Sequence, residues 1–313
     1  MDSLIYSLNA TLPVFLVIVV GYVLKQIGIL NDGFVKTANK FNFVVTLPVL
    51  LFVDLSTTDI IGDFDITYVL YCALVTTVAF FGLWIAAKFL IKDKKIVGEF
   101  VQAGYRSSAA ILGVAFIQNI YGDSGMAPVM IIGCVPLFNI FAVLVLTFEG
   151  EKDGKGNIIN SLINIVKNPI IIGIVLGVAA SLLKIDFPEI IDKTLASLAK
   201  MASPLALITI GAGFEGRKAI AKIKPTIAAT MIKLVVLPAV FLPIAIKLGF
   251  RDQALVALII MLGSPTTPSS YIMAKNMGHE GVLTSSVVVA TTLMSSLCLT
   301  FWIFVARYFG YII

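Results

Sequence analysis

GSPTTPSS, residues 263 to 270, interrupts an apolar run that extends from residue 253 to residue 276. Pro265 and Pro268 lack an amide hydrogen and their rings clash with the preceding turn, so a continuous helix here is unfavourable. Inside a membrane, irregular backbone is tolerated only where protein or a water-filled cavity satisfies the freed polar groups. The stretch therefore predicts a broken membrane helix beside a cavity. A simple proline kink in a packed helix is the alternative.

The composition of the whole chain is that of a membrane protein. Of its 313 residues, 59% are hydrophobic and 13% are charged, against roughly 25% charged in a soluble domain. One soluble core cannot bury so many apolar side chains. The basic residues behind the net charge of +5 lie in short connections between apolar runs, so they indicate membrane topology and not nucleic-acid binding.

Cysteine and histidine usage predicts no disulfide, no metal and no other cofactor. Cys72, Cys134 and Cys298 lie in apolar stretches without CxxC spacing, and His279 is the only histidine. The N-terminal MDSLIYSLNA has no basic segment before its apolar run. We therefore expect the first apolar run to remain in the mature protein.

Ten apolar runs are long enough to be membrane spans, which need ~20 residues each. Their limits are 9–28, 36–56, 65–91, 97–120, 126–148, 168–184, 190–213, 226–248, 253–276 and 281–311. The polar connection EGEKDGKGN at 149–157 separates five spans from five. We predict an all-α membrane protein with one five-helix unit at 1–150, a cytoplasmic linker at 151–167 and a second unit at 168–313.

The two units look like repeats of each other. A shift of 156 residues places Pro13 on Pro169, Gly21 on Gly177, Pro48 on Pro204, Ser108 on Ser264, Gly122 on Gly278 and Gly125 on Gly281. Because five is odd, the second copy must enter the membrane from the opposite side. The sequence thus predicts a 5+5 inverted repeat, an arrangement common in secondary transporters, whose substrate sites lie at the repeat interface.

The distribution of lysine and arginine predicts the orientation. With the N-terminus outside, 15 of the 23 basic residues lie in inner connections and 5 in outer ones, while Arg106, Lys200 and Lys233 fall within spans. Inner loops of membrane proteins carry an excess of basic residues. We expect a multi-pass protein of the cell membrane with both termini extracytoplasmic.

Span four carries YRSSAAILG at 105–113, which is equivalent to the broken stretch of span nine. If both spans break and cross, two half-helix N-termini point at one spot near the membrane centre, and their amides favour an anion. Span four has no proline, so an ordinary small-residue packing face is its alternative interpretation. The candidate substrate-binding residues are Arg106, Ser107, Ser108, Ala109, Ala110, Gly113, Lys233, Ser264, Pro265, Thr266, Thr267, Pro268, Ser269 and Tyr271.

Two basic residues within spans have alternative roles. Arg106 either attracts the anion or braces the half-helix, and in both cases it should face protein or water. Lys233 either attracts the anion, couples transport to protonation, or extends to the inner membrane face. Lys200 is expected to extend to the membrane surface.

The coupling ion stays open between proton and sodium. All the acidic residues within or beside the spans lie at or near span ends, whereas many ion-coupled carriers use a buried carboxylate. Sodium could instead be coordinated by side-chain amides together with broken-helix carbonyls, although helix-to-helix hydrogen bonding is the commoner use of these amides. They belong to Asn39, Asn42, Gln102, Gln118, Asn119, Asn139 and Asn276.

The ten spans, the 5+5 symmetry, YRSSAAILG and SPTTPSSYIMAKNMG together resemble the auxin efflux carrier family, along the whole chain. Bacterial members of that family resemble the plant PIN carriers and are associated with organic anions such as malate and malonate. The fold is similar to that of bile-acid sodium symporters. The resemblance implies a substrate site where spans four and nine cross. It also implies a scaffold of spans 1, 2, 6 and 7 that often dimerises, and a moving transport domain of spans 3–5 and 8–10.

The motifs match residue by residue, with departures. The family's arginine, small and polar residues and Leu-Gly match Arg106, Ser107, Ser108, Leu112 and Gly113, its crossover prolines match Pro265 and Pro268, and its following tyrosine matches Tyr271. Ser108 stands where the family often has asparagine, and Ala115 lies near the place of a frequent proline. These departures leave the substrate open.

The sequence predicts a transporter and not an enzyme. HExxH, a pair of mid-span aspartates and a DDxxD-like cluster are all missing, and so is the Walker motif GxxxxGK[ST] of ATP-driven proteins. We expect a homodimeric secondary active transporter of a small organic anion, a carboxylate or an auxin-like acid, that works by alternating access with an elevator or rocking motion. The alternatives are a sodium-coupled organic-anion symporter and an anion channel or sensor.

Overall fold

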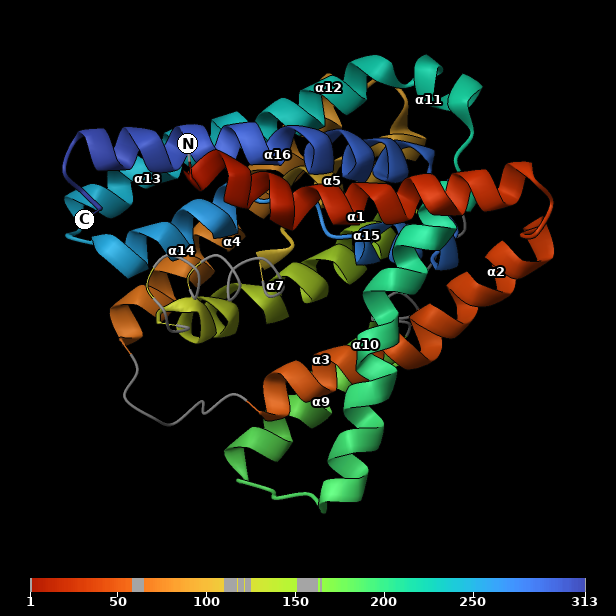
Figure 1. Ribbon diagram of the computed structural model, residues 1–313, viewed down its shortest axis with the longest axis horizontal. Coiled ribbons are helices and arrows are strands. Elements are labelled where there is room, and N and C mark those ends of the chain that lie inside the picture. Colours follow the sequence, from red (N-terminus) through yellow and green to blue (C-terminus); the bar gives the residue numbers. More distant parts are fainter. Residues whose placement is uncertain are drawn as a thin grey trace.

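The computed structural model describes residues 2–57, 65–109, 117, 121, 125–150, 163 and 165–312, and this part of the chain is helical without strands (Figure 1). The helices are α1 (Asp2–Gln26), α2 (Asp32–Phe41), η1 (Asn42–Thr46), α3 (Leu47–Ser56), α4 (Ile66–Leu90), η2 (Lys94–Ile96), α5 (Val97–Tyr105), α7 (Ala127–Phe148), α9 (Pro169–Leu182), α10 (Glu189–Ala212), α11 (Gly216–Ala221), α12 (Ile223–Met231), η3 (Ile232–Val236), α13 (Leu237–Lys247), α14 (Asp252–Gly263), α15 (Ser269–Asn276) and α16 (Val282–Tyr308).

Within the described ranges, 6 helices are long and apolar enough to cross a membrane. They are Asp32–Ser56, Ile66–Leu90, Ala127–Phe148, Glu189–Ala212, Ile223–Lys247 and Val282–Tyr308. Thr11–Gln26, Pro169–Leu182 and Asp252–Gly263 are shorter apolar helices. The all-helical, multi-pass membrane class is confirmed, and the number of ten spans stays a prediction.

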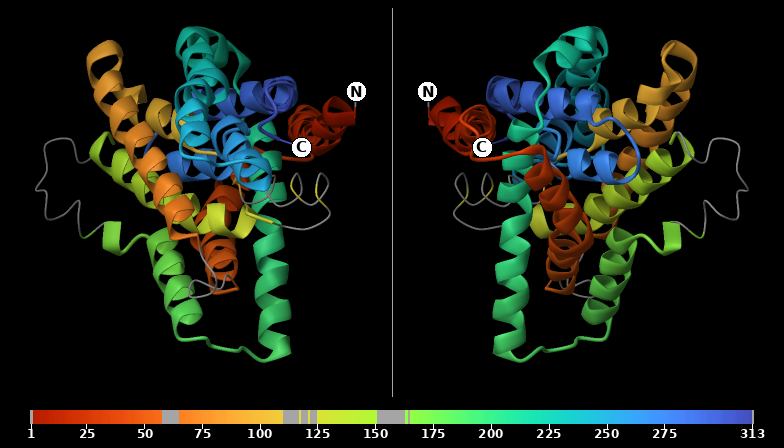
Figure 2. Two further views of the ribbon diagram at one scale, coloured as in Figure 1. Left: turned by 90° about the vertical axis from the view of Figure 1, so that its left-hand side faces the viewer. Right: turned by 90° about the vertical axis from the view of Figure 1, so that its right-hand side faces the viewer.

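Glycines allow two pairs of helices to pack with their backbones almost touching. A Cβ atom added at Gly21 of α1 would lie 2.3 Å from the Ile208 carbonyl oxygen of α10. One added at Gly177 of α9 would lie 2.9 Å from the Phe52 carbonyl oxygen of α3. Small residues at such places allow the close approach that stabilises helix pairs in membranes. Helices α3, α9 and α10 pack together, and one end of α9 and one end of α10 project beyond the other helices (Figure 2).

Helices α4, α5 and α7 pack around an aromatic cluster, next to helices gathered about α16. Helix α4 contacts α5 and α7, and α16 contacts α12, α14 and α5. The buried Phe80 ring of α4 stacks on Phe141 of α7, with ring centroids 4.5 Å apart, and meets Tyr105 at the end of α5 at 5.3 Å. Such pairs stabilise the packing beyond the apolar area that they bury. The cluster thereby fixes the end of α5, where the chain leaves the helix.

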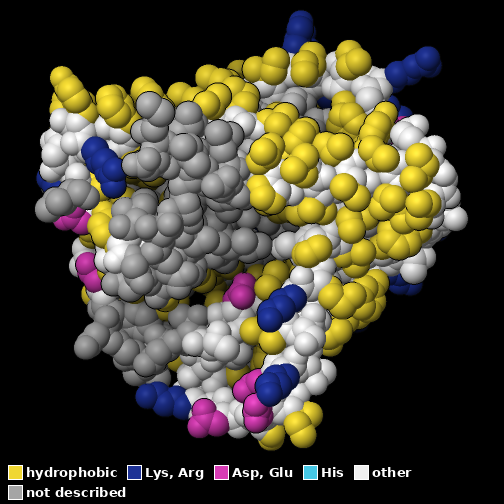
Figure 3. All heavy atoms as spheres, viewed as in Figure 1, with side chains coloured by type: hydrophobic (Ala, Val, Ile, Leu, Met, Phe, Trp, Pro, Cys, Tyr) yellow, Lys and Arg dark blue, Asp and Glu magenta, His cyan; other side chains and the backbone are white. Residues whose placement is uncertain are grey.

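Large apolar side chains cover much of the surface (Figure 3). Phe89 on α4 is 83% exposed and Ile190 on α10 is 80% exposed, and α16 carries exposed Leu297, Phe301 and Phe304. Soluble proteins rarely expose apolar surface on this scale. The distribution is that expected where lipid surrounds the helices.

Two helices of the chain end inside the protein. The break expected within 263–270 is present: α14 ends at Gly263, the backbone is extended at Ser264 (φ −75°, ψ 162°), and α15 begins at Ser269. Helix α5 likewise ends at Tyr105, and Arg106 is extended (φ −71°, ψ 144°). Residues 106–108 and 264–268 are called the crossing segments below.

Candidate functional site

The two crossing segments are joined directly to each other. The Ser108 amide donates a hydrogen bond to the Pro265 carbonyl oxygen, with N and O 2.9 Å apart. Pro265 has no amide to donate in return. The backbones of the two crossing segments are therefore in contact, as the sequence predicts, although more than 150 positions separate them in the sequence.

Each crossing segment also caps the helix that precedes the other. The last carbonyls of a helix have no partner within it. The Thr266 hydroxyl donates to the Ala103 carbonyl oxygen of α5 at 2.7 Å, and the Ser107 hydroxyl donates to the Met261 carbonyl oxygen of α14. Two of the hydroxyls predicted to hold the anion are therefore occupied by backbone.

The amides at the start of α15 are also largely occupied. The Ser270 amide donates to the Thr267 carbonyl oxygen and the Tyr271 amide to that of Pro268, each at 3.1 Å. The other predicted half-helix N-terminus, which follows residue 109, lies outside the described residues. In the described part of the site, the attraction for an anion must come mainly from side chains.

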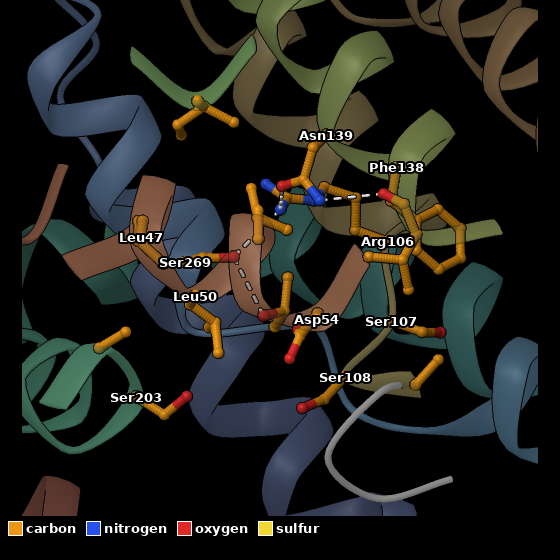
Figure 4. Close-up of a pocket in the computed structure, with 16 residues that line it drawn as sticks. Leu47, Leu50, Asp54, Arg106, Ser107, Ser108, Phe138, Asn139, Ser203 and Ser269 are labelled. Carbon is orange, nitrogen blue, oxygen red and sulfur yellow. Dashed lines mark hydrogen bonds between the residues drawn. The ribbon is translucent and has the colours of Figure 1, made fainter. Parts of the chain in front are cut away.

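Arg106 is the centre of the polar network at the crossing. It is 1% exposed, and its Nη2 atom donates to Asn139 Oδ1 at 2.8 Å and to Ser269 Oγ at 3.0 Å (Figure 4). Its Nη1 atom contacts Met273 Sδ at 3.0 Å and Gln102 Oε1 at 3.4 Å. All four acceptors are neutral, so these bonds orient the guanidinium without cancelling its charge. The Nε atom is buried without a hydrogen-bond partner.

A cavity of about 60 Å³ lies beside Arg106. Figure 4 shows Asp54 projecting into it from α3, together with Ser108, Ser203 and Ser269. A water molecule needs roughly 10–15 Å³ measured in this way, so the cavity has room for a few. The lining residues are Leu47, Leu50, Leu51, Asp54, Arg106, Ser107, Ser108, Ala109, Val135, Phe138, Asn139, Ile170, Ala202, Ser203, Thr267 and Ser269.

A second cavity, of about 80 Å³, is adjacent to the first, because Ser108 and Ser203 line both. Helices α1 and α16 supply Thr11, Val14 and Thr292 to it. Its remaining lining residues are Leu207, Pro265, Thr266 and Pro268. The crossing segments thus have small cavities next to them on more than one side, each with some polar side chains in its lining.

A much larger cavity, of about 820 Å³, reaches the other end of α15 and is called the vestibule below. Its basic lining residues are Lys25, Lys36, Lys40 and Lys275, and its acidic ones are Asp32 and Glu215. Lys25 and Asp32 form an ion pair with Nζ and Oδ1 2.5 Å apart. Tyr271 also lines the vestibule, so α15 connects this space to the crossing.

A cluster of charged residues holds the loop between α15 and α16, next to the vestibule. Glu280 pairs with Lys222, and its Oε1 atom lies 3.5 Å from Lys218 Nζ. The hydrogen bond from Lys222 lowers the pKa of Glu280 below its ordinary value. Lys275 Nζ donates to the Glu280 backbone carbonyl at 3.1 Å, so the same loop also positions a vestibule lysine.

The structure distributes the predicted site residues over several places. Arg106, Ser107, Ser108, Ala109, Thr267 and Ser269 line the first cavity, and Ser108, Pro265, Thr266 and Pro268 line the second. Ser264 is fully buried and its hydroxyl has no hydrogen-bond partner. Tyr271 lines the vestibule. Ala110 and Gly113 lie outside the described residues.

Lys233 lies apart from all three cavities. It is 0% exposed, and its ammonium donates to the Leu262 carbonyl oxygen at 2.5 Å and to that of Met261 at 3.3 Å. These carbonyls belong to the last turn of α14. The ammonium therefore does not extend to a membrane surface.

Three polar residues of the first cavity were not among the sequence-based candidates. Asp54 was expected near a span end, Asn139 was considered only as a sodium ligand or a helix-to-helix contact, and Ser203 carried no signal. An asparagine in an apolar run was the only hint available. Which way such a side chain faces depends on how α7 is rotated against α5.

Helices with exposed apolar faces, two helices that end inside the protein at segments joined to each other, and cavities with polar side chains beside those segments are features of membrane transport proteins built from discontinuous helices. Residues 6–303 match the family described as membrane transport protein, the family of the auxin efflux carriers, and the chain belongs to that family. The expected family resemblance is confirmed, and the protein is a membrane transporter and not an enzyme.

Relatives match along nearly their full lengths. An uncharacterized transporter of Methanocaldococcus jannaschii is 22% identical over 306 residues, with 94% of this chain and 97% of that protein covered. The uncharacterized transporter YfdV of Escherichia coli is 23% identical, with 97% and 99% covered. A putative malonate transporter of Rhizobium meliloti is 24% identical, with 95% and 94% covered.

Proposed function

We propose that the protein is a secondary active transporter that carries a small organic anion across the cell membrane by alternating access. The observation that carries this proposal is the buried Arg106 guanidinium beside a cavity with polar side chains in its lining, where the ends of α5 and α14 are joined. A buried arginine is expensive in a membrane. Its four neutral partners stabilise it without neutralising it. A carboxylate entering the cavity would place a negative charge beside the guanidinium and accept hydrogen bonds from it.

The size and charge of the cavities support a small carboxylate as the substrate. The first cavity, of about 60 Å³, suits a small acid better than a bulky ring. The vestibule holds four lysines against two acidic residues, and such a positive cleft raises the local concentration of anions. One relative is named a putative malonate transporter. We therefore take short dicarboxylates, with malonate first, as the candidate substrates.

We further propose that the fold is a 5+5 inverted repeat of ten spans. The contacts of Gly21 with Ile208 and of Gly177 with Phe52 support it, because a shift of 156 residues converts one pair into the other. The two units would be 1–150 and 168–313, joined by a cytoplasmic linker at 151–167. Five spans in each unit give an even total, so both termini would lie on the same side of the membrane, and the excess of lysine and arginine in the connections on the opposite side makes that side the outside.

The motion that we propose is an elevator movement of spans 3–5 and 8–10 against a scaffold of spans 1, 2, 6 and 7. Its support is the pairing of α1 with α10 and of α3 with α9 through close glycine contacts, while α4, α5 and α7 pack on one another around the Phe80 cluster. The crossing lies at the boundary between these groups. The scaffold is also where we place the contact of a homodimer, as the family resemblance implies.

The test is a survey of transport by purified protein in proteoliposomes. Labelled acetate, malonate, succinate, malate and indole-3-acetate are offered inside and outside, with sodium and pH gradients varied independently. The proposal expects saturable uptake of at least one acid that is accelerated by the same unlabelled acid on the far side. Ohmic anion conductance without such counterflow would identify a channel and contradict the proposal.

A further inference from the structure

Lys233 is a buried charge that no part of the proposed substrate site uses. It lies in η3, a five-residue π-helical turn within the span Ile223–Lys247. A π-helical turn inserts an extra residue into a helix and often occurs at functional sites. The Trp302 indole donates to the Leu234 carbonyl oxygen at 3.0 Å, which satisfies a backbone group of the turn. The turn is thus held open in the conformation that directs Lys233 at α14.

The lysine meets the carbonyl end of a broken helix. The last turn of α14 carries a partial negative charge and has carbonyls without helical partners. The Ser264 amide donates a hydrogen bond to the Ile260 carbonyl oxygen. The Lys233 ammonium donates to the carbonyl oxygens of Met261 and Leu262. Met261 also accepts from the Ser107 hydroxyl. The ammonium therefore lies in one cluster with the crossing segment that carries Arg106.

In transporters with discontinuous helices, the carbonyl ends of half-helices are places where sodium ions bind. A lysine ammonium is a compact positive charge with three donors and no acceptor. At the end of α14 it makes the contacts with carbonyl oxygens that a bound cation would make. Within the described ranges, no group of three or more histidine, cysteine, aspartate or glutamate side chains is placed to hold a metal ion.

We propose that the Lys233 ammonium is a built-in cation that occupies the place of a coupling sodium ion at the carbonyl end of α14, so that the carrier works without sodium. The inference rests on the proposed carrier function, because it states that this carrier does not need sodium. Lys233 is a positioning residue: it holds α14, and through Met261 and Ser107 the crossing, in place without touching the substrate.

The test uses the purified full-length protein in detergent and measures its melting temperature in sodium chloride and in choline chloride at equal ionic strength. Wild type is expected to melt at the same temperature in both salts. Lys233→Ala leaves space at the carbonyl end of α14, and its lowered melting temperature should rise with sodium or methylammonium but not with choline. Lys233→Met fills the space without charge, so it should be destabilised and show no response to cations. Lys200→Ala, which removes an exposed lysine of α10, is the matched control and should behave as wild type.

A sodium-specific rise in the melting temperature of wild type would overturn the inference, because a sodium site would then exist beside the lysine. The absence of any cation-specific response in Lys233→Ala would also overturn it. In proteoliposomes, Lys233→Met should transport malonate at least about tenfold more slowly than wild type, and an unchanged rate would leave the lysine as packing only. The melting measurements need no substrate, so they remain decisive if the carrier function itself fails its own test.

Discussion

The Arg106 guanidinium donates a hydrogen bond to the Ser269 hydroxyl, with Nη2 and Oγ 3.0 Å apart. Arg106 is the first residue after α5, and Ser269 is the first residue of α15. One hydrogen bond thus ties the end of α5 to the start of α15. A ligand that draws the guanidinium toward itself would act on both helices together.

Replacing Arg106 tests whether the residue attracts an anion or only braces the half-helix, because the first role affects KM and the second affects the melting temperature. Arg106→Gln should raise KM for the carried acid by about 10- to 100-fold, because a charge-assisted hydrogen bond is worth about 1.5–3 kcal/mol. Arg106→Lys keeps the charge but loses the forked contact with Asn139 and Ser269. Its KM should therefore lie between those of wild type and Arg106→Gln. Arg307→Gln, an exposed arginine near the C-terminus, is the control. Equal affinity in all variants with lowered melting temperatures would assign Arg106 to bracing alone.

Because α1 and α10 are in close contact, we predict that replacing a helical glycine by alanine lowers stability at Gly21 but not at Gly82. In Gly21→Ala the new methyl group would meet the Ile208 carbonyl oxygen, and overpacking of this kind costs about 1–3 kcal/mol. Gly82→Ala in α4 meets nothing within 4 Å, so its melting temperature should equal or exceed that of wild type. A Gly21→Ala protein as stable as Gly82→Ala would contradict the packing described above.

Asp54 shares the first cavity with Arg106 and should oppose the anion when it is ionised. Asp54→Asn removes that repulsion, and we expect KM at neutral pH to fall by about tenfold, a change that corresponds to about 1.4 kcal/mol. Because asparagine cannot ionise, the KM of the variant should also change less with external pH than that of wild type. Transport initial rates at several external pH values measure both effects. Identical pH profiles would remove Asp54 from the transport cycle.

The lysines of the vestibule should gather anions before they reach the crossing. Changing Lys36, Lys40 and Lys275 together to glutamine should lower kcat/KM from the vestibule side by about tenfold at low ionic strength. High salt should reduce the difference, because exposed charges are screened. Lys184→Gln, after α9 and outside the vestibule, is the control. A salt-independent loss would point to a structural role for these lysines.

The break between α14 and α15 could be predicted because prolines leave a strong local signal. Pro265 and Pro268 located the break after Gly263, and the repeat carried the prediction to the end of α5 at Tyr105. Helix breaking is a local property of the backbone, so it needs no knowledge of neighbours. The apolar runs located the long spans for the same reason.

What the sequence could not predict is which polar groups meet across the fold. The Lys233 ammonium reaches Leu262 only because η3 is π-helical, and no sequence pattern indicated that turn. Thr266 and Ser107 were expected to face a ligand, yet they cap α5 and α14. A hydroxyl inside a membrane protein donates a hydrogen bond to the nearest free carbonyl. Tertiary packing determines which carbonyl that is.

The central claim is that a small carboxylate is carried through the crossing beside Arg106, and counterflow measures this most directly. Proteoliposomes are loaded with unlabelled malonate, or with whichever acid the survey selects, and the entry of the labelled acid is followed. The account predicts a transient accumulation of label above equilibrium that saturates with concentration and is lost in Arg106→Gln. Entry of label that never exceeds equilibrium, or counterflow that is unchanged in Arg106→Gln, would contradict it.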